Sequence, residues 1–209
     1  MIDYALWGSA FVTFFVIMDP TGIVPIFLGM VGKRPAKDVR RLALQATATS
    51  FGVIVTFAIF GDQILEYLGI SLPALQGAGG LLLLLVALQL LLGGISPGSG
   101  QEEEVSIALV PLGTPLLAGP GAIVATILFV RQSEGSDQVL AVAAAIVSIH
   151  VVIWLALRYS TVLMRVLRPA GVTIISRIMG LLLAAIAVQL LAASVVGFVD
   201  AYQSGAALG

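Results

Sequence analysis

The amino-acid sequence predicts an all-α membrane protein in which six transmembrane helices form two inverted three-helix repeats. Three observations support this fold class. The 209 residues are 59% hydrophobic and only 10% charged, with a mean hydropathy of +1.11, whereas soluble domains have about 25% charged residues. Long runs without a charged residue divide the chain into spans, and the two halves of the chain resemble each other.

The composition excludes several classes of function. Ten Lys and Arg residues against eleven Asp and Glu residues give a net charge of -1, so bulk charge does not favour a nucleic-acid partner. The chain has no cysteine and one histidine, which removes thiolate metal sites and leaves little scope for a zinc site. We expect no metal and no cofactor. We also expect no Ser/Lys, Ser/His or paired-Asp combination at matching depth, and therefore no enzyme.

Uncharged runs set the number of spans, because a membrane helix needs roughly 20 apolar residues. One run, residues 4–32, contains a single charged residue, Asp19, and five other runs contain none. Six spans with short connections leave no room for a soluble domain, so we expect one membrane domain over residues 1–209. The first run lacks the basic region of a signal peptide and is expected to remain as the first helix. The five uncharged runs cover residues 42–61, 67–101, 105–130, 138–157 and 178–199.

The two halves of the chain match at a constant offset of 100 residues. Residues 80–91 and 180–191 are identical at eight of twelve positions, which include a glycine and a glutamine. Each unit has an odd number of helices, so the second unit enters the membrane in the opposite orientation, as in many secondary transporters. At the same offset Pro20, Ile23, Val24, Val39 and Ala43 match Pro120, Ile123, Val124, Val139 and Ala143. We expect the first repeat at 1–95, a cytoplasmic linker at 96–107 and the second repeat at 108–209.

The basic residues indicate the orientation in the membrane. Nine of the ten Lys and Arg residues fall in the first and fifth connections, and Arg131 is the exception. Because cytoplasmic loops carry an excess of Lys and Arg, both termini are expected outside, in a multi-pass protein of the inner (cytoplasmic) membrane. The cytoplasmic linker carries the acidic run Glu102 to Glu104 and is typical of a solvated flexible segment. The first connection holds Lys33, Arg34, Lys37, Arg40 and Arg41, and the fifth holds Arg158, Arg165, Arg168 and Arg177.

Proline and glycine interrupt the first and fourth spans at corresponding places. Residues 18–25 read MDPTGIVP and residues 111–122 read PLGTPLLAGPGA. Proline removes a backbone donor and glycine relaxes the backbone, so we expect either unwound segments or re-entrant hairpins. The freed backbone groups and the half-helix N-termini suit the two charged ends of a zwitterion. The alternative is that both segments are packing kinks, since Pro and Gly are common in membrane helices.

Asp19 is the only acidic residue within a predicted span. A carboxylate in hydrocarbon is costly, and such residues are typically proton relays or ligand partners. We therefore expect Asp19 to bind a substrate ammonium or to carry a coupling proton. An alternative and compatible role is to cap the second half of the helix, with Pro20 at its first position.

Other polar residues within the predicted spans are candidates for a supporting role. His150 is a candidate for proton coupling because imidazole titrates near neutral pH, and the alternative is a hydrogen-bonded interior group. Gln89 and Gln189 are matched by the repeat, and they either bond the unwound segments across helices or contact the substrate. The polar residues of the second span that suit a cavity-facing surface are Gln45, Thr47 and Ser50.

The two interrupted segments together resemble the MarC family of bacterial and archaeal inner-membrane proteins, which are also grouped as six-span neutral amino-acid transporters. The resemblance rests on MDPTGIVPIFLGM near the N-terminus and PLGTPLLAGPGAI at mid-chain, and it covers essentially the whole chain. The chain departs from the family at Ile23, where asparagine is common, and this removes a polar group. The family's DP-x-G-x-x-P pattern falls on Asp19, Pro20, Gly22 and Pro25, and its P-L-x-x-P-x-x-x-G-P-G pattern falls on Pro111, Leu112, Pro115, Gly119, Pro120 and Gly121.

The resemblance implies proton-coupled transport of glycine, alanine and other small neutral amino acids by alternating access, with sodium as the alternative coupling ion. An exporter of drugs or other metabolites and a non-transporting membrane scaffold or regulator stay open as alternatives, as does assembly into a homo-oligomer. The expected substrate-binding residues are Asp19, Pro20, Thr21, Gly22, Pro115, Gly119, Pro120, Gly121 and Ala122. Asp19 and His150 are expected to couple the proton, and Gln45, Thr47, Ser50, Gln89 and Gln189 to support a polar cavity.

Overall fold

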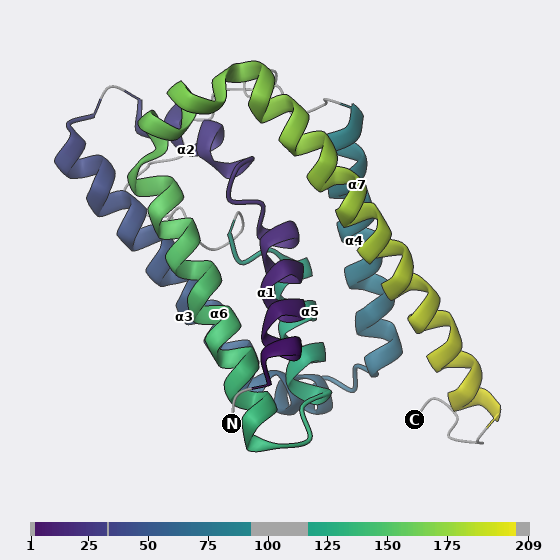
Figure 1. The fold of residues 1–209 in the computed structure, drawn as a ribbon. Helices are drawn as coiled ribbons and strands as arrows, with labels where there is room; N and C mark the ends of the chain where they lie inside the picture. The colour runs from purple at the N-terminus through teal and green to yellow at the C-terminus, as the bar shows by residue number, and fades with distance from the viewer. Residues whose placement is uncertain (1–2, 33, 93–116, 204–209) are drawn as a thin grey trace.

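The computed structural model describes residues 3–32, 34–92 and 117–203. Within these ranges the chain forms helices and no strand, which confirms the all-α class (Figure 1). The helices are α1 (Tyr4–Met18), α2 (Ile23–Val31), α3 (Ala36–Tyr67), α4 (Leu72–Leu92), α5 (Pro120–Arg131), α6 (Ser136–Arg158) and α7 (Ser160–Gln203).

Several of the described helices are long and apolar enough to cross a membrane. They are α3, α4, α6 and the part Ala170–Gln203 of α7. Helices α1 and α2 meet the same criterion together, as one span bent by 48°. The chain is therefore a multi-pass membrane protein. The expected fourth span, residues 105–130, begins outside the described residues, and its second part is the short helix α5.

Helices α3 and α7 extend beyond the expected spans into the basic connections. Helix α3 begins at Ala36, so Lys37, Arg40 and Arg41 lie on its first turns. Lys and Arg are good helix formers, and their long side chains reach the headgroup region from a helix end. Helix α6 ends at Arg158 and α7 begins at Ser160, so the fifth connection is also largely helical.

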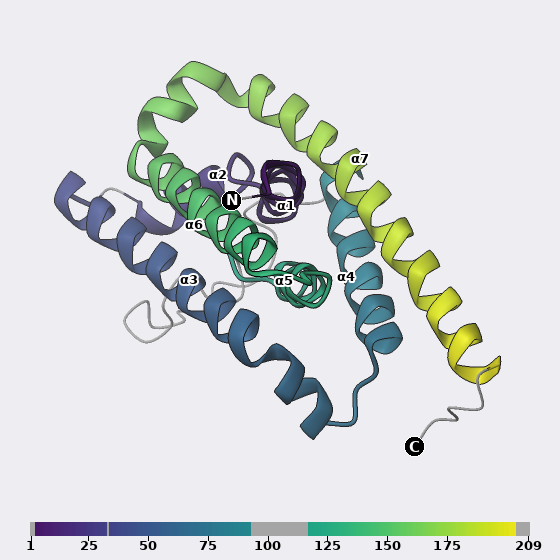
Figure 2. The same cartoon turned by 60° about the horizontal axis from the view of Figure 1, so that its bottom comes forward.

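Helix α7 is broken at Arg168, whose φ of 55° and ψ of 164° lie outside the helical region. The break has a local cause, because the residue before a proline disfavours the helical conformation and residue 169 is a proline. Residues 160–167 lie across the end of the bundle at which α6 ends. From Ala170 the helix runs back beside α4 (Figures 1 and 2).

The buried side chains of the described residues form two hydrophobic cores. The larger core is built by α1, α2, α3, α5 and α6 and includes Phe14, Ile54 and Ile149. The smaller core joins α4 to α7, which form a pair beside the larger group of helices (Figure 2). Helix α1 contributes to both cores and so connects them. The buried residues of the smaller core are Val16, Leu83, Ala87, Leu183 and Ala187.

Two glycines allow the close approach of α4 and α7, which run antiparallel (Figure 1). A Cβ atom at Gly80 would lie 2.9 Å from the backbone oxygen of Ala187. A Cβ atom at Gly180 would lie 3.2 Å from the backbone oxygen of Ala87. The missing side chains therefore let the two backbones approach directly, as small residues do in membrane helix pairs.

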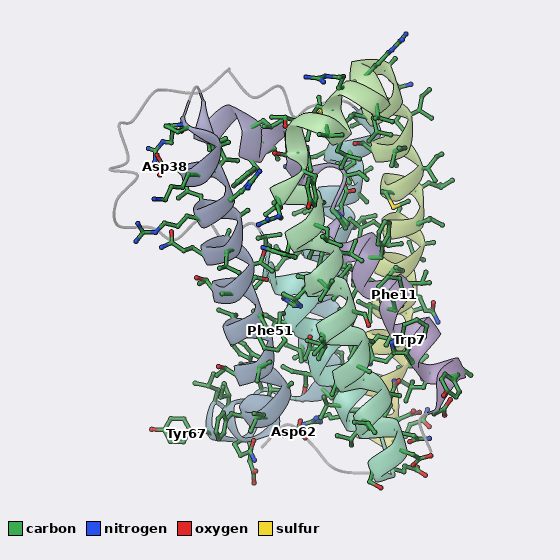
Figure 3. All side chains as sticks on the ribbon, turned by 60° about the vertical axis from the view of Figure 1, so that its left-hand side comes forward. Trp7, Phe11, Asp38, Phe51, Asp62 and Tyr67 are labelled. Carbon is green, nitrogen blue, oxygen red and sulfur yellow. The ribbon has the colours of Figure 1, made fainter. Side chains whose placement is uncertain are left out.

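The two ends of the described chain lie at the same end of the molecule (Figure 1). Three tyrosines on α1, α3 and α7 are strongly exposed near this end, Tyr4 at 76%, Tyr67 at 91% and Tyr202 at 84%. Exposed aromatic residues are typical of the membrane–water boundary. Arg131 of α5 forms an ion pair with Asp62 of α3 at the same end, where Figure 3 labels Asp62 and Tyr67.

Candidate functional site

The first span is interrupted at Asp19, as the sequence predicts. Helix α1 ends at Met18, and α2 begins at Ile23. Asp19 takes a left-handed conformation, with φ 35° and ψ 73°, and its N–H donates to the carbonyl oxygen of Phe15 at 3.1 Å. Pro20 follows, which disfavours a helical conformation at residue 19, and aspartate is among the residues that tolerate positive φ. The break therefore follows from local chain chemistry.

The Asp19 carboxylate is held by its own turn. Its Oδ1 accepts hydrogen bonds from Thr21 Oγ1 at 2.8 Å and from the Gly22 N–H at 3.0 Å. A Cβ atom at Gly22 would overlap this carboxylate, so the arrangement requires glycine at that position. The hydrogen bond from Gly22 is the one expected if Asp19 caps the following helix. However, α2 begins at Ile23, so Pro20 lies in the turn and not, as the sequence had predicted, at the first helical position.

The second interruption is described from residue 117 onward. Gly119 is extended, with φ -63° and ψ 163°, and α5 starts directly after it with Pro120 in its first turn. Proline suits this position because its missing N–H has no partner in a helix in any case. Ala122 is buried, and Gly121 packs against Leu83 of α4. Pro115, another expected substrate contact, lies outside the described residues.

The structure brings the two interruptions to one level of the molecule. Helix α1 runs from one end to the middle, and α5 runs from the middle back to that end, beside α1 (Figures 1 and 2). The rings of Phe14 and Phe129 pack between these helices, with centroids 5.7 Å apart. On either side of the interruptions, Met18 and Ile23 share one buried core with Ala122. The end of α1 and the start of α5 therefore belong to one packed region.

His150 is buried in the middle of α6, and the structure pairs it with Ser50 of α3. The imidazole Nδ1 lies 2.7 Å from the carbonyl oxygen of Ile146, and Nε2 lies 3.3 Å from Ser50 Oγ. The carbonyl oxygen can only accept, so Nδ1 is the donor to it, whereas Nε2 accepts from the serine hydroxyl in the neutral ring and donates to its oxygen in the imidazolium. The rings of His150 and Phe51 pack in a T-shaped arrangement, with centroids 5.2 Å apart. His150 thus has the hydrogen bonds of an interior group, and its role in coupling stays a prediction.

The Ser50–His150 pair corrects one expectation from the sequence. We expected no serine and histidine at matching depth, and that was wrong, because α3 and α6 place them in contact. The pair has no carboxylate behind the imidazole, since Nδ1 is bonded to a backbone carbonyl. A serine activated for catalysis normally has a base that a third group orients toward it.

The remaining polar candidates divide into interior and surface groups. Thr47 is buried, and its hydroxyl donates to the carbonyl oxygen of Ala43 at 2.9 Å. Gln45, Gln89 and Gln189 are exposed on α3, α4 and α7. The structure therefore does not gather these three amides around Asp19, and their contribution to a polar cavity stays a prediction.

Sequence reasoning missed Thr126, which is completely buried on α5. Its hydroxyl donates to the carbonyl oxygen of Ala122 at 2.7 Å, one turn after the start of the helix. The sequence could have indicated this residue, because Thr126 follows Ala122 by four positions and so lies on the same face of a helix. Across the described part of the chain, no group of three His, Cys, Asp or Glu side chains is arranged to hold a metal ion.

Comparisons with known proteins give a family for this chain. A model described as MarC family integral membrane protein matches residues 4–199. A UPF0056 membrane protein of Methanocaldococcus jannaschii is 37% identical over 197 residues, which cover 91% of this chain and 96% of the relative. The UPF0056 membrane protein YhcE of Escherichia coli is 32% identical over 203 residues, which cover 93% of this chain and 94% of the relative. No solved structure matches the chain.

Proposed function

The chain belongs to the MarC family of integral membrane proteins, and on that premise we propose that it is a secondary transporter of small neutral amino acids such as glycine and alanine. The observation that carries the proposal is the interruption of the first span at Asp19, at the same level as the start of α5. Non-helical backbone within a membrane protein persists only where protein or a water-filled cavity satisfies its polar groups. Such interruptions are typical of transport sites.

The chemistry around the two interruptions suits a zwitterion. Asp19 Oδ1 accepts both hydrogen bonds of its turn, so Oδ2 is the oxygen offered to a substrate ammonium. The N-terminus of α5, at Gly119 to Gly121, carries the partial positive charge that favours a carboxylate. The surrounding core is apolar and closely packed, which favours a substrate with a small side chain.

Contacts between the two halves support an inverted repeat. Gly80 packs on Ala187, and Gly180 packs on Ala87, so each contact is the counterpart of the other at the offset of 100 residues. Ser50 contacts His150, and these two residues are themselves related by the offset of 100 residues. Reciprocal contacts of this kind are expected when a pseudo-twofold axis in the membrane plane relates two repeats. Alternating access then consists of movement of the α4–α7 pair against the larger core.

The proposal includes an orientation in the inner membrane. The start of α3 and the first part of α7 lie at the end opposite the two termini (Figure 1), and both segments carry basic residues. The excess of Lys and Arg on cytoplasmic segments favours that end inside and both termini outside. The coupling ion in the proposal is the proton, carried by Asp19 with His150 as the second candidate, and sodium is tested as the alternative.

The proposal is tested by uptake of labelled glycine and alanine into proteoliposomes, with and without an inward proton gradient. A separate arm applies an inward sodium gradient. We compare the wild type with Asp19→Asn and with Asp200→Asn, which makes the same change on an exposed residue of α7. The expected result is gradient-driven uptake by the wild type and Asp200→Asn, and loss of uptake in Asp19→Asn.

The other outcomes separate the alternatives. Uptake that survives Asp19→Asn would leave the transporter but reduce Asp19 to a structural cap. Absence of uptake of both amino acids, from protein with a cooperative unfolding transition, would refute the substrate class and favour an exporter or a non-transporting protein.

A further inference from the structure

The end of the molecule opposite the termini carries positive charge on three helices. Helix α3 begins there, α6 ends there and residues 160–167 of α7 cross it (Figures 1 and 3). Among the acidic side chains that the structure describes, Asp38 lies at this end, near the start of α3 (Figure 3). The described part of this end therefore has an excess of positive charge, and such an excess attracts ligands of the opposite sign. The basic residues of this end are Arg34, Lys37, Arg40, Arg41, Arg158, Arg165 and Arg168.

Residues 160–167 form an amphipathic segment across this end. Leu163 and Met164 pack against the larger core. Val162 and Val166 point away from it, with 52% and 72% of their surface exposed, and Arg165 is exposed beside them. Exposed apolar side chains flanked by a basic residue are typical of a helix that lies in the boundary between headgroups and acyl chains.

Arg158 lies where α6 meets this segment, and two aromatic rings hold its guanidinium group. The guanidinium carbon is 5.1 Å from the centroid of the Trp154 ring and 5.7 Å from that of Tyr159. A guanidinium stacked on aromatic faces keeps its N–H edge available for two parallel bonds to a phosphate. Among the residues that the structure describes, the ion pair joins Arg131 to Asp62 at the opposite end of the molecule. Arg158 therefore forms no ion pair with a carboxylate of those residues.

From these observations we propose that this end of the protein binds the phosphate headgroups of anionic phospholipids, with Arg158 and Arg165 as the principal contacts. The exposed Val162 and Val166 favour a lipid over a free anion, because their apolar surface is covered by the acyl chains that adjoin the headgroup. The inference rests on charge and exposed surface and is independent of the proposed transport.

The test measures lipid binding by the full chain in neutral detergent micelles. Phosphatidylglycerol, phosphatidylcholine and inorganic phosphate are added in separate titrations. The chain has two tryptophans, so Trp7→Phe leaves Trp154, stacked on Arg158, as the only source of tryptophan fluorescence. Retention of radiolabelled lipid gives a second readout, which does not depend on the stack. We expect saturable binding of phosphatidylglycerol and much weaker binding of phosphatidylcholine.

Charge variants locate the binding surface. Each basic residue near an anionic surface contributes about fivefold in affinity, so Arg158→Gln with Arg165→Gln should weaken phosphatidylglycerol binding by about 25-fold. Arg158→Lys keeps the charge but loses the planar stack, and an intermediate loss is expected. Arg131→Gln makes the same charge change at the opposite end and should leave lipid binding unchanged.

Three results would overturn the proposal. The first is equal affinity for phosphatidylglycerol and phosphatidylcholine. The second is competition by inorganic phosphate at the concentration of the lipid, which would make the surface a site for free anions. The third is unchanged lipid binding in the double variant. If the double variant fails to fold, Arg165→Gln alone carries the test, and it should reduce the salt dependence of phosphatidylglycerol binding.

Discussion

Replacing Gly80 by alanine tests the packing of α4 on α7, on which the arrangement of the two halves depends. The new Cβ atom would lie 2.9 Å from the backbone oxygen of Ala187. A backbone oxygen in a helix cannot rotate away as a side chain can, so the two helices must separate by a few tenths of an ångström. That separation loosens the smaller core along the whole contact of α4 with α7.

The magnitude is the difference between two terms. Overpacking of a close contact costs about 1–3 kcal/mol, and the better helix propensity of alanine offsets about 1 kcal/mol of it. We therefore expect Gly80→Ala to lower the free energy of unfolding by about 1 kcal/mol. Gly180→Ala should have a similar or slightly smaller effect, because its Cβ atom would lie 3.0 Å from the Leu90 Cβ and 3.2 Å from the backbone oxygen of Ala87.

The assay is reversible unfolding in mixed micelles with increasing sodium dodecyl sulfate, followed by far-ultraviolet circular dichroism. Gly52→Ala is the matched control, because this glycine lies on α3 with no atom within 4 Å of the added Cβ. The control should be as stable as the wild type or more stable. Equal stability of Gly80→Ala and Gly52→Ala would show that the contact at Gly80 does not limit how closely α4 and α7 pack.

Three further substitutions test individual contacts. Gly22→Ala should displace the Asp19 carboxylate from its turn and reduce glycine uptake by proteoliposomes at least about tenfold, and uptake at the wild-type rate would contradict the proposed site. Ser194→Ala removes a hydroxyl that donates to the backbone oxygen of Pro73 at 2.7 Å, so it should lower the free energy of unfolding by about 0.5–1.5 kcal/mol. Ser50→Ala removes the hydroxyl that lies 3.3 Å from the imidazole of His150. The variant should show less stimulation of uptake by a proton gradient, whereas Ser50→Thr should retain the stimulation. Equal stimulation in the wild type, Ser50→Ala and Ser50→Thr would argue against coupling at this pair.

The interruption of the first span was predictable because its causes are local. Pro20 lacks a backbone donor and restricts the residue before it, and both effects act within a few residues. The membrane class followed from the composition alone. The length of α3 was harder to predict from the sequence, because the basic residues that border an uncharged run are also good helix formers and can extend the helix beyond that run.

Contacts between helices could not be derived from the sequence in the same way. The pairing of Ser50 with His150 depends on which faces of α3 and α6 meet, and an uncharged run does not define a face. The exposure of Gln89 and Gln189 likewise depends on how α4 and α7 pack. The position of residues 160–167 across the end of the bundle follows from the break at Arg168. Pro169 explains this break, but only after the structure has shown that the residues on both sides of it are helical.

If the interruption at Asp19 forms the substrate site, bound substrate should protect a single thiol placed there from alkylation. The chain has no cysteine, so Thr21→Cys introduces the only reactive thiol, next to the Asp19 carboxylate. Thr56→Cys, on the exposed face of α3, is the control. The rate of alkylation by a membrane-permeant maleimide is measured in proteoliposomes with and without glycine.

Glycine and alanine should slow the alkylation of the Thr21→Cys variant in a saturable manner, and neither should change the rate for Thr56→Cys. If the Thr21→Cys variant takes up glycine but is alkylated at the same rate with and without saturating glycine, the interruption at Asp19 is not the substrate site, because transport then uses another site.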